Sequence, residues 1–316
     1  MTRPARLCLF LCLTLWFGDA ASAQSTVPEV LSASSPYGES IVRRNIPYVA
    51  NPSPRQNFDL YLPRTNLGKA FPLIVWIHGG AWTMGIKDWD NVKYLVRHGY
   101  AIASLDYRIA PESKFPAQIQ DCNLALNFIV AHAEAYGVDP RRLVVAGASA
   151  GGHVALLLGL ARHEPDFGAN PAIKPVAILD FFGPVDLNQM ENDLLAVHSE
   201  KGLALIRDVG PKFLGSPIEQ SSVQGRKASP VNYVTSASPR VLILQGGKDD
   251  LVPAAQSWRL RTALNKAGVK NQLTMIDNAG HDGPQFSTKE IESRVAEFLA
   301  GAFTVASDPI PTSRSL

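Results

Sequence analysis

Residues 142–160 read RLVVAGASAGGHVALLLGL, and this stretch decides the kind of fold that the chain adopts. The apolar run Arg142 to Ala146 has the character of a buried strand, and Val154 to Leu160 is apolar on all sides, as a buried helix is. Between them, Gly147-Ala148-Ser149-Ala150-Gly151 matches the G-x-S-x-G turn that places a serine on a sharp strand-to-helix bend. Side chains at the two glycines would collide with neighbouring segments in such a bend. The stretch therefore predicts a nucleophile, Ser149, at a helix N-terminus, where partial positive charge favours a developing anion.

Outside this stretch, short β-type runs alternate with longer helical patterns. Six runs read as buried strands because they are apolar, often β-branched and bounded by turn residues. They are Phe71 to Ile77, Tyr100 to Leu105, Arg142 to Ala146, Val176 to Phe181, Arg240 to Leu244 and Gln272 to Ile276. This alternation predicts an α/β fold with a mostly parallel central sheet and helices on both faces. Ile46 to Val49 and Phe58 to Leu62 are expected to form an antiparallel pair at the sheet edge.

Local signals indicate where helices begin and end. Ala117 to Tyr136 is expected to be one helix, with Gly137 as its C-cap. Cys122 lies on the apolar stripe of this helix, which favours a buried small hydrophobe over a reactive thiol. The last helix is expected to begin at Ser287, because Glu290 follows three residues later. Its apolar face is formed by Ile291, Val295 and Phe298.

One segment, Gly183 to Pro239, looks irregular because Gly, Pro and Ser are frequent in it. It lies between the fourth and fifth expected strands, where a small cap over a site would be inserted. About 57 residues are too few for a large separate lid domain. We therefore expect a single domain with an open or lightly covered pocket.

A second motif, His78-Gly79-Gly80-Ala81-Trp82, directly follows the strand Phe71 to Ile77. Loops of this type supply main-chain N–H donors to an oxyanion, and glycine lets the backbone approach the reacting carbonyl. Gly80 and Ala81 are the predicted donors, with Ala150, the residue after the nucleophile, as the third. The alternative is a tight Gly-Gly turn without a catalytic role.

A serine hydroxyl needs a base, and the chain has seven histidines. His281 is the predicted base because its loop follows the last strand, and α/β sheets place ligand sites at the carboxyl ends of strands. We expect a structural hydrogen bond for His78 and a packing role for His153. The other four have no catalytic context and are expected at the surface: His98, His132, His163 and His198.

The residue that orients the base should lie between the serine and the histidine in sequence. Asp249 and Asp250 follow the strand Arg240 to Leu244. The spacing from the strand favours Asp249, and Asp250 is expected to face solvent. The predicted carboxylate would hold the imidazole tautomer of His281 and stabilise its charged form.

The whole-chain properties limit the possible functions. The 316 residues are 46% hydrophobic and 18% charged, as in a globular protein, and the net charge of +2 comes with no run of more than two adjacent basic residues. Binding to nucleic acid is therefore not expected. Neither a metal ion nor an organic cofactor is required by the predicted chemistry.

The first 23 residues have the pattern of a secretory signal peptide. Arg3 and Arg6 precede the apolar run Leu7 to Phe17, and Ala21-Ser22-Ala23 is a small-residue ending, so cleavage is expected before Gln24. The alternative is a membrane anchor, but the apolar run is well short of the roughly 20 residues that a spanning helix needs. We expect an exported protein, periplasmic or secreted, with a domain over residues 24–303 and a flexible tail over 304–316.

With these residues in place, the sequence resembles α/β-hydrolase esterases related to hormone-sensitive lipase, and in particular the bacterial feruloyl and acetylxylan esterase-like group, BD-FAE. The resemblance runs from about Pro47 to Phe303. The acid of that group lies in a stretch similar to G-D-K-D-x-L-V-P, which implies Asp249. The group's Asp-Tyr-Arg-x-x-x-Glu signature is also present, and we interpret its residues as bracing the loop beside the site: Asp106, Tyr107, Arg108, Glu112 and, further on, Asp121.

The chain departs from the group at two places. Ala81 replaces a third glycine, and Gln245-Gly246-Gly247 replaces the more usual His-Gly-Asp. Both departures affect the neighbourhood of the triad and not its members. They bear on the shape of the pocket and on the choice of substrate.

The prediction is thus a serine carboxylic-ester hydrolase that forms an acyl-enzyme on short-chain acyl or aryl esters, either small molecules or carbohydrate-linked. Trp82 and the segment Gly183 to Pro239 are expected to line the substrate cleft, although core packing explains Trp82 equally well. One alternative is an amide hydrolase, such as an aryl-formamidase or a peptidase, with the same triad. A second alternative is a ligand-binding module on the same fold.

Overall fold

The computed structural model describes residues 29–35, 38–64, 70–218 and 222–306. Within these residues, nine strands form one sheet in the order β1-β2-β3-β5-β4-β6-β7-β8-β9. The strands are β1 (Glu29–Ser35), β2 (Gly38–Pro47), β3 (Asn57–Pro63), β4 (Phe71–Ile77), β5 (Ala101–Leu105), β6 (Val138–Ala148), β7 (Ala177–Phe181), β8 (Arg240–Gly246) and β9 (Asn271–Ile276). Pairing is antiparallel from β1 through β3 to β5 and parallel from β5 to β9. The predicted mostly parallel sheet is confirmed.

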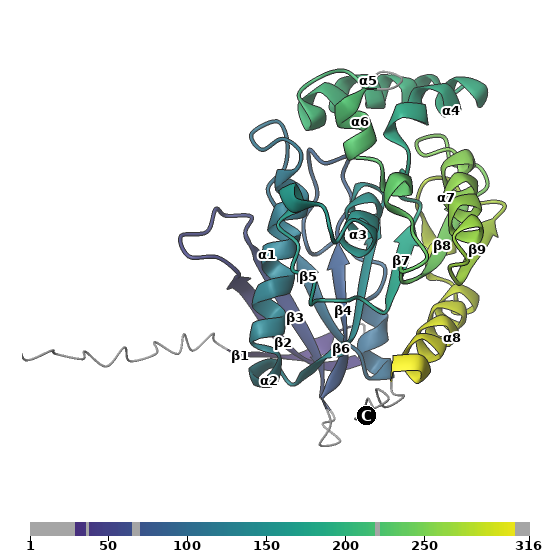
Figure 1. The fold of residues 1–316 in the computed structure, drawn as a ribbon. Helices are drawn as coiled ribbons and strands as arrows, with labels where there is room; N and C mark the ends of the chain where they lie inside the picture. Colours follow the sequence, from purple (N-terminus) through teal and green to yellow (C-terminus); the bar gives the residue numbers. More distant parts are fainter. Residues whose placement is uncertain (1–28, 36–37, 65–69, 219–221, 307–316) are drawn as a thin grey trace, which may run out of the picture.

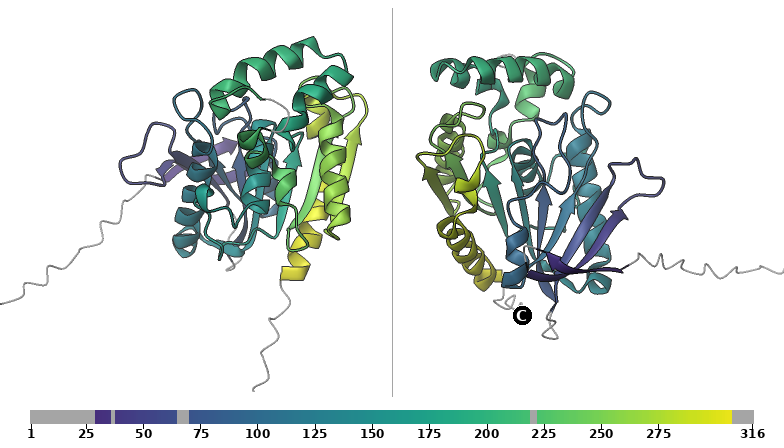
Figure 2. Two further views of the ribbon diagram at one scale, coloured as in Figure 1. Left: turned by 45° about the horizontal axis from the view of Figure 1, so that its top comes forward. Right: turned by 180° about the vertical axis from the view of Figure 1, so that it is seen from behind.

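Helices cover both faces of the sheet (Figures 1 and 2). The α-helices are α1 (Ala117–Ala131), α2 (Ala133–Tyr136), α3 (Ala150–Leu160), α4 (Met190–Ala196), α5 (Glu200–Leu214), α6 (Val223–Lys227), α7 (Ala254–Lys266) and α8 (Lys289–Ala306). The short 3₁₀ helices are η1 (Lys93–His98), η2 (Pro165–Phe167), η3 (Leu187–Gln189), η4 (Pro230–Tyr233) and η5 (Pro284–Ser287). Apolar residues of α1, α3, α5 and α7 belong to one core cluster, and those of η1 and α8 belong to a second cluster on the other face. The sheet is therefore buried on both sides, as its continuous apolar strands require.

All six predicted strands are present, and β6 is much longer than its apolar run. It begins at Val138, and its register with β4 shifts between Pro72 and Leu73. Pro140 lies at this irregularity, and Asp139 accepts a hydrogen bond from the backbone N–H of Arg141 at 3.0 Å. An apolar pattern detects only the regular part of such a strand.

The antiparallel pair is confirmed, but its first strand was placed too late in the sequence. β2 begins at Gly38, and β1 pairs along its outer side, so β2 is not the edge. The register of β2 shifts between Arg43 and Ile46, where Asn45 has a φ of 55°. This kink interrupts the alternation of apolar and polar residues from which a strand is recognised.

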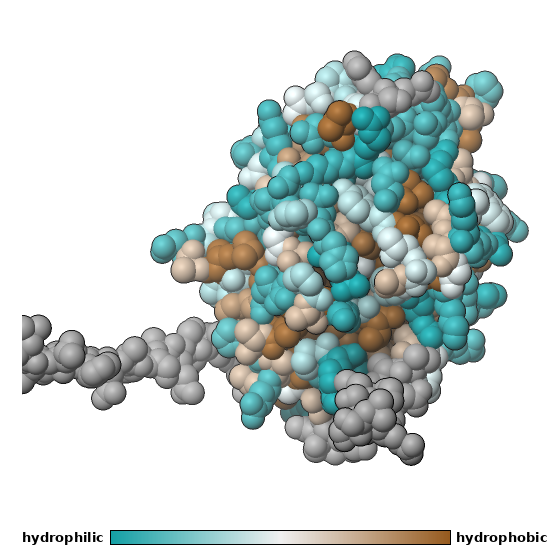
Figure 3. Space-filling model, in the orientation of Figure 1, coloured by the Kyte–Doolittle hydropathy of each residue, from teal (hydrophilic) through white to brown (hydrophobic). Residues whose placement is uncertain are grey.

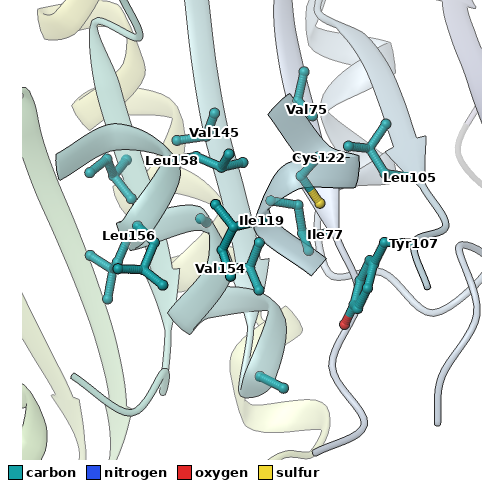
Figure 4. Close-up of a cluster of buried hydrophobic side chains, with 14 of the residues drawn as sticks. Val75, Ile77, Leu105, Tyr107, Ile119, Cys122, Val145, Val154, Leu156 and Leu158 are labelled. Atoms are coloured by element: carbon teal, nitrogen blue, oxygen red, sulfur yellow. The ribbon is translucent and has the colours of Figure 1, made fainter. Parts of the chain in front are cut away.

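The predicted helix Ala117 to Tyr136 is divided at His132 into α1 and α2. The Nδ1 atom of His132 lies 2.8 Å from the carbonyl oxygen of Phe128, so the side chain competes for a helical acceptor. Gly137 ends α2 in the left-handed conformation, as expected. Cys122 is fully buried next to Val75 and Leu105 (Figure 4), and burial raises the pKa of its thiol well above the ordinary value. The prediction of an inert small hydrophobe agrees with this environment.

α8 begins at Lys289, two residues later than predicted. Pro284–Ser287 forms a 3₁₀ turn, and Thr288 is the cap, since its Oγ1 accepts a hydrogen bond from Ile291 N at 3.4 Å. Ile291, Val295 and Phe298 are buried, as expected. The helix continues to Ala306, so residues 304–306 are helical and are not part of a tail.

The segment 183–239 is mostly helical, not irregular. It contains α4, α5 and α6, which lie beyond the carboxyl ends of the parallel strands (Figure 1). The Ser and Gly residues that suggested loops are helix caps: Ser199 and Ser222 cap N-termini with their side chains, and Gly215 ends α5. The Ser and Gly residues that interrupt the helical pattern in the sequence thus mark the ends of helices.

On the face shown in Figure 3, hydrophilic residues are widespread and hydrophobic ones occur in small groups. No helix in the described part of the chain is long and apolar enough to cross a membrane. The expected signal peptide and residues 307–316 of the expected tail lie outside the described residues.

Candidate active site

Ser149 lies on the bend between β6 and α3, as the G-x-S-x-G stretch predicts. Its backbone has φ 55° and ψ −124°, a strained conformation for a residue with a side chain. The bend is held by Ser149 N, which donates to Phe181 O at 2.8 Å, and by His153 N, which donates to Ser149 O at 3.0 Å. Every residue of α3 is buried, so the helix fixes the serine firmly.

The two glycines of the motif are needed for close packing. A Cβ atom at Gly147 would lie 2.3 Å from Gly151 O, and one at Gly151 would lie 2.1 Å from Ile77 O. Backbone atoms cannot move aside at such distances without distorting β4 or α3. The motif therefore has glycine at positions 147 and 151 because the backbone packing leaves no room for a Cβ atom there.

His281 and Asp249 meet Ser149 from two other strand ends. His281 Nε2 lies 2.8 Å from Ser149 Oγ, and His281 Nδ1 lies 2.9 Å from Asp249 Oδ2. Asp249 follows β8 and His281 follows β9, so all three side chains come from carboxyl ends of parallel strands. The distances allow a proton to pass from the hydroxyl to the imidazole while the carboxylate holds the ring.

The two neighbouring aspartates have different environments. The Asp249 side chain is fully buried, and its Oδ1 accepts hydrogen bonds from Leu251 N at 2.9 Å and Val252 N at 2.8 Å. The Asp250 side chain is 51% exposed and lies 3.8 Å from Lys201 Nζ. The structure thus places Asp249 against the imidazole and Asp250 toward solvent.

Gln245 is a site residue that had been noted only as a departure from the family pattern. Its Nε2 donates to Asp249 Oδ2 at 3.1 Å and to Val252 O at 3.1 Å. Its Oε1 accepts from Ser257 Oγ at 2.7 Å, which fixes the orientation of the amide. The available signal was a buried polar residue in an apolar strand.

Phe182 was also missed. Its ring packs edge-on against the His281 ring, with centroids 4.9 Å apart, and so limits rotation of the imidazole. Phe182 has a positive φ of 46°, and its N–H donates to Leu244 O at 2.8 Å. Nothing in its apolar surroundings distinguishes it in sequence from a core phenylalanine.

The loop after β4 brings Gly80 and Ala81 to the same hollow as Ser149 and His281. Gly80 has a φ of 113°, Ala81 a φ of 49° and Trp82 a φ of 61°, so three successive residues are in conformations that side chains disfavour. Ala150, the first residue of α3, borders a second hollow at Ser149 together with Ala81. The three residues predicted to supply N–H donors therefore border the two hollows at Ser149.

His78 supports this loop from behind. Its ring stacks on Tyr107 with centroids 4.4 Å apart, and its Nδ1 lies 2.7 Å from Gly79 O. On the other side its Nε2 lies 3.3 Å from Asp106 Oδ1. The expected structural role of His78 fits these contacts.

The signature residues brace the neighbouring segments, with one exception. Asp106 accepts a hydrogen bond from Lys87 N at 3.0 Å, and Arg108 makes paired hydrogen bonds to Asp121, the shortest at 2.7 Å. Tyr107 donates to His78 O at 2.8 Å. Glu112 is exposed in a turn, and the interpretation of it as a brace was wrong.

Trp82 serves mainly as a packing residue. It is 3% exposed, and its ring stacks on Phe213 of α5 with centroids 4.4 Å apart. Its Nε1 donates to His153 Nδ1 at 3.2 Å, and His153 Nε2 lies 2.6 Å from Ala228 O. Burial lowers the pKa of His153 to about 4, so the ring is neutral near pH 7. The remaining four histidines are exposed: His98, His132, His163 and His198.

Two hollows meet at Ser149 and His281. The wide hollow has a volume of about 640 Å³, opens to solvent, and is bordered by Trp89, Asp90, Phe182 and Pro284 among others. The narrow hollow has a volume of about 30 Å³, and its wall is almost entirely apolar, including Trp82 and residues of α5. Trp82, although only 3% exposed, therefore also borders the narrow hollow.

Asp180 is a buried carboxyl group behind the nucleophile. Its Oδ1 accepts a hydrogen bond from Gly183 N at 3.0 Å, and burial raises its pKa to about 8. The group is therefore neutral near pH 7 and adds no negative charge beside the serine. In the described part of the chain, no group of three or more His, Cys, Asp or Glu side chains is arranged to hold a metal ion.

Comparisons with known proteins agree with this geometry. Residues 58–264 match the profile of the BD-FAE family. The chain is similar to esterase LipQ of Mycobacterium tuberculosis, with 30% identity over 81% of this chain and 61% of that protein. It is also similar to the isoprenylcysteine alpha-carbonyl methylesterase ICME of Arabidopsis thaliana, with 28% identity over 76% of this chain and 56% of that protein. The chain thus spans somewhat more than half the length of these two relatives.

Solved structures show the same architecture. A truncated carbohydrate esterase from gut microbiota superposes with a TM-score of 0.71 and 26% identity, covering 83% of this chain and 96% of that one. Esterase B from Lactobacillus rhamnosus superposes with a TM-score of 0.71 at 18% identity, covering 84% of this chain and 85% of that one, and shows likeness of fold alone. The match to the family profile spans well over half of this chain. The sheet order, the bend at Ser149 and the site at the strand ends agree with that match. This chain therefore belongs to the BD-FAE family and has the α/β-hydrolase fold.

Proposed function

We propose that this protein is a serine carboxylic-ester hydrolase that works through an acyl-enzyme on Ser149. The observation that carries the proposal is the continuous chain of contacts Ser149 Oγ–His281 Nε2 at 2.8 Å and His281 Nδ1–Asp249 Oδ2 at 2.9 Å. The esterase names of relatives that cover most of this chain support it.

In the proposed reaction, His281 Nε2 takes the proton of Ser149 Oγ as this oxygen bonds to the ester carbonyl carbon. The carbonyl oxygen becomes an oxyanion that the N–H groups of Gly80, Ala81 and Ala150 stabilise. His281 then gives its proton to the leaving alcohol. Water, deprotonated by the same imidazole, attacks the acyl-enzyme and releases the acid.

The unequal hollows support a short acyl group and a larger alcohol. The narrow hollow offers about 30 Å³, room for roughly two water-sized groups, whereas the wide one is open to solvent. Trp89, whose residue surface is 51% exposed, and Asp88, whose side chain is 56% exposed, border the wide hollow, a combination that suits a sugar ring. The carbohydrate esterase among the similar structures supports a carbohydrate-linked ester.

We also propose that the protein is exported, to the periplasm or the medium, after cleavage before Gln24. The basic, apolar and small-residue regions of the first 23 residues support this. N-terminal sequencing of the protein recovered from outside the cytoplasm would test it, and an intact Met1 in the cytoplasmic fraction would contradict it.

The test of the activity is hydrolysis of p-nitrophenyl esters from acetate to octanoate, with Ser149→Ala as the matched variant. We expect turnover with short acyl chains and a loss of several orders of magnitude in the variant. Anilides assayed in parallel separate the alternatives, because faster anilide cleavage would favour an amide hydrolase. If neither substrate is cleaved and a serine-directed phosphonate does not react with Ser149, the esterase proposal fails and a binding role gains support.

A further inference from the structure

One helix supplies a large part of the wall of the narrow hollow. Four residues of α5 border it: Gly202, Leu205, Ile206 and Val209. They are spaced i, i+3, i+4 and i+7, so they form one stripe on the helix surface that faces Ser149. Ile206 and Val209 are 5% and 3% exposed, and this burial indicates that the stripe is packed against the site. The size of the hollow therefore depends on where α5 lies and on the side chains of this stripe.

α5 is attached to the catalytic loops at both of its ends. At the N-terminus, Ser199 Oγ accepts from Gly202 N at 2.9 Å and donates to Asp250 O at 2.6 Å. A Cβ atom at Gly202 would lie 2.5 Å from Asp250 O, so the helix and the loop of Asp249 are already in closest contact. At the other end, Phe213 stacks on Trp82 of the loop after β4. The wall is thus held in a defined position relative to Ser149.

Size and openness determine which hollow receives which half of an ester. His281, which must give its proton to the leaving alcohol, borders both hollows. The wide hollow opens to solvent, where the alcohol leaves, and has room for a larger group. The narrow hollow is therefore the place for the acyl chain. Leu205 and Leu251 border both hollows and separate them beside Ser149.

We infer that the α5 stripe sets the acyl-chain length of the substrate, with Leu205, Ile206 and Val209 closing the space after two or three carbons. This inference rests on the proposed function, because it assigns the acyl half of an ester to the narrow hollow. It predicts preference for acetyl and propionyl esters over butyryl and longer ones. One methylene that does not fit a hydrophobic pocket typically changes kcat/KM by about 10- to 200-fold.

The test compares kcat/KM for p-nitrophenyl acetate, butyrate and octanoate in single variants of α5. Leu205→Ala and Ile206→Ala enlarge the hollow, so we expect the butyrate-to-acetate ratio to rise about tenfold. Leu203→Ala is the matched control, because it removes the same side chain from the same helix outside the lining of either hollow. We expect its ratio to equal that of the unmodified protein.

Val209→Leu provides an independent arm in which the wall gains one methylene. It should lower butyrate turnover more than acetate turnover. Because this variant removes no buried side chain, it still tests the inference if an alanine variant fails to fold. An unchanged ratio in Leu205→Ala, Ile206→Ala and Val209→Leu, with acetate turnover retained, would overturn this inference and leave the esterase proposal intact. Absence of all Ser149-dependent ester turnover in the unmodified protein would overturn both.

Discussion

Adjacent residues of identical chemistry have opposite environments in the loop after β8. Asp249 is buried with its oxygens held by two backbone N–H groups and the amide of Gln245, whereas Asp250 is half-exposed beside Lys201. Only the first is within hydrogen-bonding distance of the imidazole. The two carboxylates differ because their side chains leave the backbone in different directions, that of Asp249 toward His281 and that of Asp250 toward solvent.

Asp249→Asn is expected to lower kcat by about 10⁴-fold, because an amide can hold His281 in the wrong tautomer and does not stabilise the imidazolium. Asp250→Asn loses only a distant exposed contact to Lys201, so kcat should remain within about threefold. Steady-state kinetics with p-nitrophenyl acetate measures both. Equal losses in the two variants would mean that the acid has been assigned incorrectly.

Gln245 is expected to position the acid of the triad. In Gln245→Leu, Asp249 Oδ2 loses its amide donor, and we expect kcat to fall about tenfold with little change in KM. Gln245→His, which restores a ring N–H at this position, should recover part of the loss. A rise in KM at constant kcat would contradict the positioning role, and thermal unfolding of each variant shows whether it is folded.

At the scale of elements, one cap helix, α5, is coupled to the site by its N-cap. Ser199 and Ser222 each accept a hydrogen bond from the residue three positions later, at 2.9 Å in both cases. Ser199 alone of the two also donates to the loop of the acid, through Asp250 O at 2.6 Å. Ser222 Oγ donates to Asn188 Oδ1 at 3.2 Å, so its link stays within the segment 183–239, whereas Ser199 connects α5 to the loop of Asp249.

Ser199→Ala and Ser222→Ala should each lower the free energy of unfolding by about 1 kcal/mol through loss of an N-cap. We expect Ser199→Ala to lower kcat for acetate as well, because the loop that carries Asp249 loses its attachment to α5. Urea unfolding and initial rates on the two variants make the comparison. Equal kcat values in the two variants would show that the link between α5 and the acid loop has no catalytic effect.

For the whole molecule, two buried groups make stability depend on pH in opposite directions. The pKa of Asp180 is raised from 3.8 to about 8, so its contribution is fully present below pH 3.8 and is lost as pH rises through 8. The pKa of His153 is lowered from 6.5 to about 4, so its contribution is present above pH 6.5 and is lost as pH falls through 4. Between about pH 4 and 6.5 the two slopes cancel, and above that Asp180 acts alone.

In the unmodified protein, the free energy of unfolding should therefore fall by about 2 kcal/mol between pH 6.5 and 8, and in Asp180→Asn this fall should be absent. The amide keeps an acceptor for Gly183 N and stays neutral over this range. Urea unfolding at pH 5, 6.5 and 8 measures the effect, with the exposed Asp208→Asn as a control that should behave like the unmodified protein. The same decline above pH 6.5 in Asp180→Asn would show that another group causes it.

The local sequence determined the parallel core of the sheet, the elbow and the loop after β4. Buried parallel strands are continuous apolar runs, and the bend at Ser149 leaves no room for side chains at Gly147 and Gly151. Such requirements act between near neighbours in the chain, so they leave a readable pattern. The same reasoning placed Ser149, Asp249 and His281 at strand ends, and the structure brings those three side chains together.

Other features were decided only by the tertiary structure. The segment 183–239 was mistaken for an irregular one because Ser199, Ser222 and Gly215 mark helix ends and Pro211 lies inside α5. The apolar faces of these helices acquire meaning only against the loops around Ser149. Gln245, Phe182 and the α5 stripe acquire their roles from partners 4 to 99 positions away in sequence, such as Asp249 and His281. The sequence of one strand shows which of its residues lie at its carboxyl end. The packing of the whole sheet and its helices decides which side chains from different strand ends face one another.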